Sequence, residues 1–183
     1  MTTPIEQELQ DAGLELVGNC GTLAARGPQL LQRCTLLEGF NAAEANTLGS
    51  SMLLVRAQPG QTLIREGDVG DWMLILLSGT VDVTKRAVAD DVLALARGEP
   101  SRLSVIRTGA AIGEMSMLDG EPRYATCTAL EPVEAGVLTR AAISQLIREQ
   151  PAVGAKLLLR INQQLAQRLR NTSTQLVKLL QKR

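Results

Sequence analysis

The spacing of apolar residues changes along the chain and divides it into helical ends and a β-rich middle. Residues 4–16 and 29–52 repeat apolar positions at helical intervals, and the first of these segments carries acidic residues in its first turns. Asn41 stands three residues before Glu44, a spacing that predicts a helix N-cap. We therefore expect a short helix over 4–16, a break at 18–21, and two short helices over 29–52.

Short apolar or β-branched runs follow, separated by turns that contain glycine. This pattern predicts tight antiparallel strands, and their regular spacing favours a sandwich or a roll. Residues 86–101 are rich in alanine and charge and are expected to form an extended loop. The expected strands cover residues 53–56, 62–65, 73–77, 80–84, 103–107, 125–130 and 134–139.

The last third of the sequence has a helical pattern. We expect a helix over residues 140–149, stopped by Pro151, and a long helix from about 152 to 180. An apolar stripe on this long helix favours a seam between two helices of a homodimer, and the alternative is that the stripe packs on the chain's own roll. The stripe is formed by Leu158, Ile161, Leu165, Leu169, Thr172, Leu176 and Leu179.

These elements predict an α+β fold, mainly β: an antiparallel, jelly-roll-like β-roll with N-terminal helices and a long C-terminal helix. We divide it into a helical extension over residues 1–28, the roll with its flanking helices over 29–150, and the long helix over 151–183. A chain of 183 residues with 45% apolar content is long enough to bury one good core.

Composition narrows the function. Lys plus Arg and Asp plus Glu both number 19, so the overall charge does not favour nucleic acid or an anionic membrane. The chain has no histidine, which disfavours imidazole catalysis and the usual metal sites of β-roll enzymes. The lack of histidine thus makes a non-enzymatic binding protein without a metal the expected class. Three scattered cysteines and no long apolar stretch predict that it is cytoplasmic and does not bind a membrane.

Charge is unevenly distributed, because no acidic residue follows Glu149. This basic end either faces an acidic partner or simply complements the helix dipole. The basic residues there are Lys156, Arg160, Arg168, Arg170, Lys178, Lys182 and Arg183.

The segment 112–126 combines groups that suit a small ligand with an anion and hydroxyls. Gly113 lets the backbone approach a ligand, and the residues after it can form a short helical turn. Arg123 offers a guanidinium fork for phosphate oxygens, and Glu114 is an acceptor for paired hydroxyl donors. The same two residues could instead form an ion pair that braces a loop.

This segment resembles the phosphate-binding cassette of the cyclic-nucleotide-binding domains found in the catabolite activator protein and in regulatory subunits of cyclic-AMP-dependent kinase. Gly113-Glu114, Arg123 and Ala125-Thr126 carry the resemblance, and glycine turns at 59–60, 66–68 and 79 extend it. The resemblance implies that Arg123 binds a cyclic phosphate, that Glu114 binds the ribose 2′-hydroxyl, and that the backbone of Gly113, Met115 and Ser116 lines the pocket.

Two features refine the resemblance. Tyr124 stands where the family usually has Ala, Ser or Thr, so a hydroxyl that helps to select cyclic GMP is missing. Arg168-Leu169 followed by Thr172-Ser173 is similar to the dimer helix of the catabolite activator protein, in which a Thr and a Ser from two subunits hold the adenine. Thr172 and Ser173 are therefore candidates for contacting the base.

The resemblance implies a sensor of cyclic AMP, with cyclic GMP or cyclic di-GMP as less favoured ligands. Ligand would close the cassette, move the hinge at 140–151, and reposition the long helix for a homodimer partner or an unknown downstream protein. No helix-turn-helix follows the long helix before Arg183, so we expect no DNA binding. The alternative function is a protein-interaction module whose pocket is unused and whose basic long helix is the binding surface. A β-roll metal enzyme is the least favoured alternative.

Overall fold

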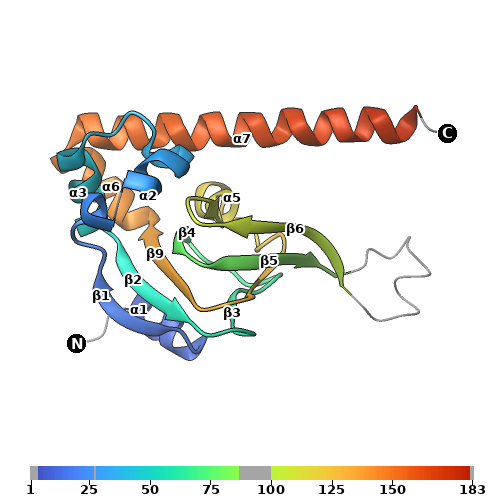
Figure 1. Cartoon of the computed structure of the whole chain (residues 1–183), viewed down its shortest axis with the longest axis horizontal. Helices are drawn as coiled ribbons and strands as arrows, with labels where there is room; N and C mark the ends of the chain where they lie inside the picture. The colour runs from blue at the N-terminus through green and yellow to red at the C-terminus, as the bar shows by residue number, and fades with distance from the viewer. Residues whose placement is uncertain (1–3, 27, 87–99, 182–183) are drawn as a thin grey trace.

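Two antiparallel sheets form the centre of the molecule (Figure 1). The computed structural model describes residues 4–26, 28–86 and 100–181. One sheet has the strand order β1-β2-β9-β4-β7 and the other has the order β3-β8-β5-β6. The strands are β1 (Glu15–Asn19), β2 (Leu53–Ala57), β3 (Thr62–Ile64), β4 (Trp72–Ser78), β5 (Thr80–Lys85), β6 (Ser101–Arg107), β7 (Ala111–Ile112), β8 (Thr126–Ala129) and β9 (Val133–Thr139).

The antiparallel roll expected from the sequence is confirmed, and every expected strand is present with ends that shift by at most two residues. The sequence did not predict β1 and β7. The expected helix over 4–16 is wrong beyond Asp11, because Gly13 turns the chain with φ 79° and the next residues pair with β2 as strand β1. The expected loop over 86–101 falls almost entirely outside the described residues.

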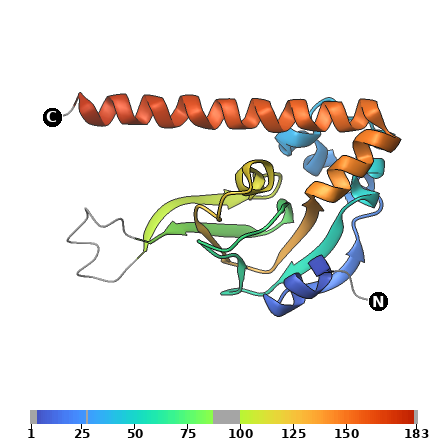
Figure 2. The same ribbon diagram turned by 180° about the vertical axis from the view of Figure 1, so that it is seen from behind.

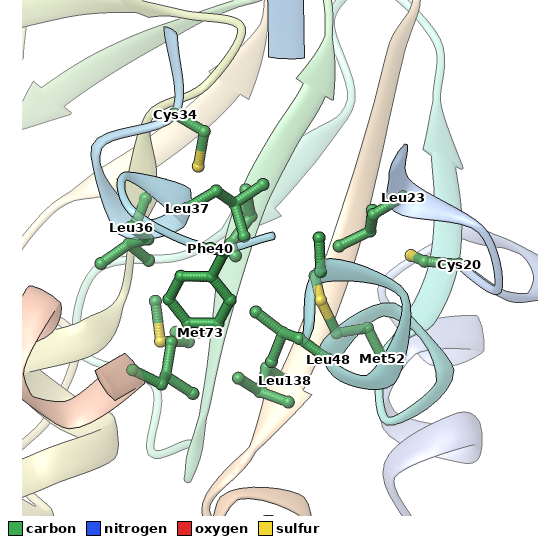
Figure 3. Packing of buried hydrophobic residues seen from close by; sticks show 14 of the residues in the cluster. Cys20, Leu23, Cys34, Leu36, Leu37, Phe40, Leu48, Met52, Met73 and Leu138 are labelled. Atoms are coloured by element: carbon green, nitrogen blue, oxygen red, sulfur yellow. The ribbon is translucent and has the colours of Figure 1, made fainter. Parts of the chain in front are cut away.

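Strand β4 is buried on both faces, which explains its continuous apolar sequence. Because side chains alternate across a strand, Trp72, Leu74 and Leu76 enter the interior of the roll. Met73, Ile75 and Leu77 face a second core between the sheet and the helices. Figure 3 shows Met73 in this second core beside Phe40 and Leu138.

Short helices precede the roll. They are α1 (Pro4–Asp11), the 3-10 turns η1 (Leu23–Arg26) and η2 (Thr35–Leu37), α2 (Pro28–Arg33) and α3 (Ala42–Ser50). The expected N-cap is confirmed: Asn41 Oδ1 accepts from Glu44 N–H at 2.9 Å, and Glu44 Oε2 accepts from Asn41 N–H at 2.8 Å. Helix α1 lies on the opposite side of the roll from the long helix in both views (Figures 1 and 2).

Helices α6 (Arg140–Glu149) and α7 (Pro151–Leu180) follow β9 and confirm the predicted helices. The first part of α7 packs on α6 and η2 through Val153, Leu157 and Ile161, which are buried. Leu158 and Leu165 of the predicted stripe are partly buried, whereas Leu169, Leu176 and Leu179 are exposed. Packing on the chain's own core thus explains only the first part of the stripe. Among the helices described, none is both long and apolar enough to cross a bilayer.

Candidate functional site

A cavity of about 260 Å³ lies between the roll, α7 and the short helix α5 (Glu114–Asp119). Seven of the residues predicted from the sequence line it: Gly113, Glu114, Met115, Ser116, Arg123, Tyr124 and Ala125. The other lining residues are Ile64, Val83, Leu103, Ser104, Ile106, Ile112, Cys127 and Arg168. The structure therefore brings most of the predicted site into one place.

Three predicted residues are not among those that line the cavity. The Thr126 hydroxyl accepts a hydrogen bond from the backbone N–H of Glu66 at 3.0 Å and so braces the turn after β3. Thr172 and Ser173 are exposed on α7 and lie outside the cavity of this single chain.

Gly113 makes the connection between β7 and α5 possible. Its φ of 81° is a left-handed conformation that favours glycine. A Cβ at this position would lie 2.7 Å from Arg123 Nη1, so the missing side chain also leaves room for the guanidinium. Helix α5 ends at Asp119, and the N–H of the next residue, Gly120, donates to the Ser116 carbonyl at 2.9 Å. The predicted short helical turn after Gly113 is confirmed.

Arg123 is a buried cation with several fixed contacts. Its Nη1 donates to the Gly113 carbonyl at 2.8 Å, and its Nη2 donates to the Trp72 carbonyl at 2.7 Å. The guanidinium lies 4.3 Å from the centroid of the Trp72 ring. Burial lowers the pKa of Arg123, and the Glu8 carboxylate is the largest of the charges that oppose this shift. The guanidinium is thus held in one orientation at the edge of the cavity.

Glu114 is only 1% exposed. Its Oε1 accepts a hydrogen bond from Arg168 Nη1, and Arg168 Nη2 donates to the Ala111 carbonyl at 2.6 Å. Its Oε2 is buried and has no hydrogen-bond partner among the residues that the structure describes. Burial raises the pKa of the Glu114 carboxyl, and the charges of Arg168 and Arg123 act against this rise. One buried carboxylate oxygen therefore has unused hydrogen-bonding capacity.

Arg168 was not predicted as a site residue, although its position before Leu169 was part of the resemblance in the long helix. The sequence gives no signal that pairs it with Glu114. The apolar wall of the cavity was also missed, because Ile64, Val83 and Ile106 read only as ordinary strand residues. Such a wall suits a flat heterocyclic ring.

Tyr124, the residue that departs from the family pattern, lies at the rim. Its side chain is 59% exposed, and Lys85 Nζ lies 4.0 Å from the centroid of its ring. The same ammonium group donates to the Tyr124 carbonyl at 2.7 Å and pairs with Glu66 at 3.3 Å. The ring is therefore held by cation-π contact at the entrance and is not part of the core.

These features together define a β-roll that holds a guanidinium, a carboxylate and an apolar wall around one cavity. The family described as the cyclic nucleotide-binding domain matches residues 54–150 of the sequence. The chain belongs to this family, and the resemblance inferred from the cassette is confirmed.

Individual relatives agree with this assignment. A cyclic nucleotide-binding domain from Methylobacillus flagellatus KT superimposes with a TM-score of 0.75 at 30% identity, over 96% of this chain and 91% of that one. The Thermus thermophilus catabolite activator protein superimposes with a TM-score of 0.68 at 26% identity, over 79% of this chain and 62% of that one. The CRP-like cAMP-activated global transcriptional regulator of Mycobacterium tuberculosis is 28% identical over 83% of this chain, which spans 62% of the regulator's length.

Proposed function

We propose that this protein is a sensor of cyclic AMP in which the nucleotide controls the position of α7. The observation that carries the proposal is that Arg123 and Glu114, both buried, line one cavity and that α7 reaches the same cavity through Arg168. A buried guanidinium and a buried carboxylate are costly to keep in an unused pocket. This cost argues against the alternative of an interaction module with no ligand.

Each part of the nucleotide has a matching group. The cyclic phosphate is assigned to Arg123, the ribose 2′-hydroxyl to the unpartnered Oε2 of Glu114, and the base to the apolar wall. The backbone of Gly113, Met115 and Ser116 lines the remaining side. Thr172 and Ser173 are exposed, so we assign them to the base only in a homodimer formed through α7.

The signal arises from the ion pair between Arg168 and Glu114. A ribose hydroxyl that donates to Glu114 shares the carboxylate with Arg168, so the bound and free states differ in how α7 is held. A ligand shifts a conformational equilibrium only through such a differential contact. The contact of Arg140 with the Met117 carbonyl at 2.7 Å connects α5 to α6 and gives the hinge proposed over residues 140–151 a second link to the site.

Cyclic AMP is the proposed ligand for two reasons. The Mycobacterium tuberculosis relative is named as cAMP-activated, and Tyr124 offers no small hydroxyl beside Arg123. The role we propose is regulatory, with no catalytic step and a downstream protein as the receiver. Cys20, Cys34 and Cys127 are all free and buried, which supports a reducing compartment such as the cytoplasm.

Calorimetric titration with cyclic AMP, cyclic GMP and cyclic di-GMP tests the ligand. We expect cyclic AMP to bind most tightly and Arg123→Ala to abolish detectable binding, because a charge-assisted contact to the phosphate is lost. Arg107→Ala is the matched control, since Arg107 is exposed on β6 and does not line the cavity. Preference for another nucleotide would overturn the choice of ligand, and no binding to any would favour the interaction module.

A further inference from the structure

Helix α1 lies on the far side of the roll from α7, yet it is connected to the arginine of the proposed phosphate site (Figures 1 and 2). The Trp72 indole N–H donates to Glu8 Oε1 at 2.8 Å. The same indole also contacts Arg123, whose guanidinium lies 4.3 Å from the ring centroid. Glu8, Trp72 and Arg123 thus form a continuous chain of contacts from α1 to the cavity.

The space around Arg123 leaves the guanidinium little freedom. A Cβ on Gly70 would lie 2.7 Å from Arg123 Nη2 and 3.2 Å from Trp72 Nε1. A Cβ on Gly113 would lie 2.7 Å from Arg123 Nη1. Two glycines therefore flank the guanidinium, and the Trp72 ring covers its face. The indole is thus one of the groups that restrict the orientation of the guanidinium, together with the carbonyls of Gly113 and Trp72.

Helix α1 is built into the roll. Leu9 is fully buried in the interior cluster, and Leu14, just after the helix, is buried in the same cluster. A second cavity of about 280 Å³ lies between the end of α1, strand β3 and the turn that follows it, and Glu8, Trp72 and Arg123 all line it. Arg123 therefore stands between the nucleotide cavity and the cavity beneath α1.

We propose that Trp72 is a positioning residue for Arg123 and that α1, through Glu8, supports the phosphate site from behind. Docking of α1 and binding of the cyclic phosphate are then coupled, and each strengthens the other by the same factor. This inference rests on the proposed function. It adds α1 to α7 as a second surface helix whose position is coupled to nucleotide binding.

The test compares cyclic AMP with its two phosphorothioate diastereomers, in which one or the other exocyclic oxygen is sulfur. A guanidinium in a fixed place distinguishes the diastereomers, so the ratio of their dissociation constants reports its position. Trp72→Leu is expected to weaken cyclic AMP binding by about fivefold to thirtyfold, the effect of a lost desolvated cation-π contact, and to move the ratio toward one. Gly70→Ala is expected to move the ratio in the same direction by displacing the guanidinium.

Glu8→Ala tests the part played by α1, and Gln10→Ala, an exposed position on the same helix, is its control. We expect Glu8→Ala to weaken cyclic AMP binding and shift the ratio, and Gln10→Ala to do neither. Melting temperatures of the free variants identify any that do not fold, and the remaining variants then decide the question. An unchanged ratio in folded Gly70→Ala and Glu8→Ala would overturn the inference. The proposed function would still stand in that case if the wild type binds cyclic AMP and Arg123→Ala does not.

Discussion

Arg168 of α7 and Glu114 of α5 form an ion pair across 54 positions of sequence. The pair lies beyond Ile161, the last fully buried residue of α7, so it fixes a part of the helix that has little apolar packing. The contacts of Arg168 with Glu114 and with the Ala111 carbonyl therefore hold this part of α7 next to the cavity. This arrangement makes the helix sensitive to whatever occupies the cavity.

Removing Arg168 is expected to destabilise the protein without ligand. Arg168→Ala leaves the Glu114 carboxylate buried without its cation, which costs about 1–3 kcal/mol. The double variant Arg168→Ala/Glu114→Gln should recover part of this loss, because a neutral amide is less costly to bury. Urea unfolding of the four proteins of this double-mutant cycle measures the coupling. Strictly additive effects would contradict a direct energetic link between the two residues.

Gly113→Ala is expected to damage both folding and binding. The φ of 81° is strained for alanine by about 1 kcal/mol or more, and the new methyl group would lie 2.7 Å from Arg123 Nη1. We expect a lower free energy of unfolding and a loss of cyclic AMP affinity of more than about tenfold. Gly60→Ala is the control, because Gly60 has a similar φ of 85° and no heavy atom of the described residues would lie within 4 Å of its Cβ. Equal nucleotide affinity in the two variants would show that the space beside Arg123 is unimportant.

Acid should weaken the contacts of Glu134. This carboxylate pairs with Arg26 at 2.7 Å and with Arg56 at 2.9 Å, and the two guanidinium groups lower its pKa. A carboxyl whose folded pKa lies below its unfolded value stabilises the fold above the unfolded pKa, and this contribution is lost as the pH falls through the folded pKa. Glu134→Gln should therefore cost about 1 kcal/mol at neutral pH and almost nothing once the pH has fallen below the folded pKa of Glu134.

Denaturant unfolding at a series of pH values checks this prediction, with Glu121→Gln as an exposed carboxyl control. The stability difference between the wild type and Glu134→Gln should shrink as the pH falls. A difference that stays constant through the acid range would mean that the two ion pairs contribute no stability.

The exposed leucines of α7 are expected to form a homodimer seam. Leu169, Leu176 and Leu179 are between 57% and 69% exposed in the single chain, although they follow the stripe predicted from the sequence. Light scattering at micromolar concentration should give the mass of a dimer for the wild type and of a monomer when all three are changed to glutamine. Gln167→Ala/Thr174→Ala, on the opposite side of the helix, should remain dimeric.

The same triple variant tests Thr172 and Ser173. If the partner's α7 supplies these hydroxyls to the base, loss of the dimer should also weaken cyclic AMP binding. A wild-type protein that stays monomeric with saturating nucleotide would exclude both the seam and the assignment of Thr172 and Ser173.

Sequence reasoning located the regular elements because their signals are local. The short apolar or β-branched runs of β2, β4 and β9, the cap at Asn41 and the stop at Pro151 are each contained within a few residues. Strand β7 has only two residues and forms because it pairs with β4, so no local pattern marks it. The same holds for β1, whose pairing with β2 overrides the helical spacing of the residues before it.

The cassette from Gly113 to Thr126 could be predicted for the same reason, since its residues are close in sequence. The contacts that complete the cavity connect distant segments. Arg168 reaches Glu114 over 54 positions, and Arg123 reaches Trp72 over 51. Hydrophobic periodicity carries no information about such pairs, so Arg168 and Trp72 emerge only from the three-dimensional arrangement.

The account depends most on the statement that nucleotide occupancy controls the position of α7. Spin labels at Glu121→Cys, just after α5, and at Asn171→Cys, on α7, measure this directly, because both positions are exposed. Burial raises the pKa of Cys20 and Cys34 to about 11 and that of Cys127 to about 12, so the native thiols should label slowly. An excess of unlabelled protein keeps the measured distance within one chain.

We predict that saturating cyclic AMP shifts the distance distribution between these two labels and that Arg123→Ala prevents the shift. The same distribution with and without bound nucleotide, in protein shown by calorimetry to be saturated, would contradict the proposal that α7 carries the signal.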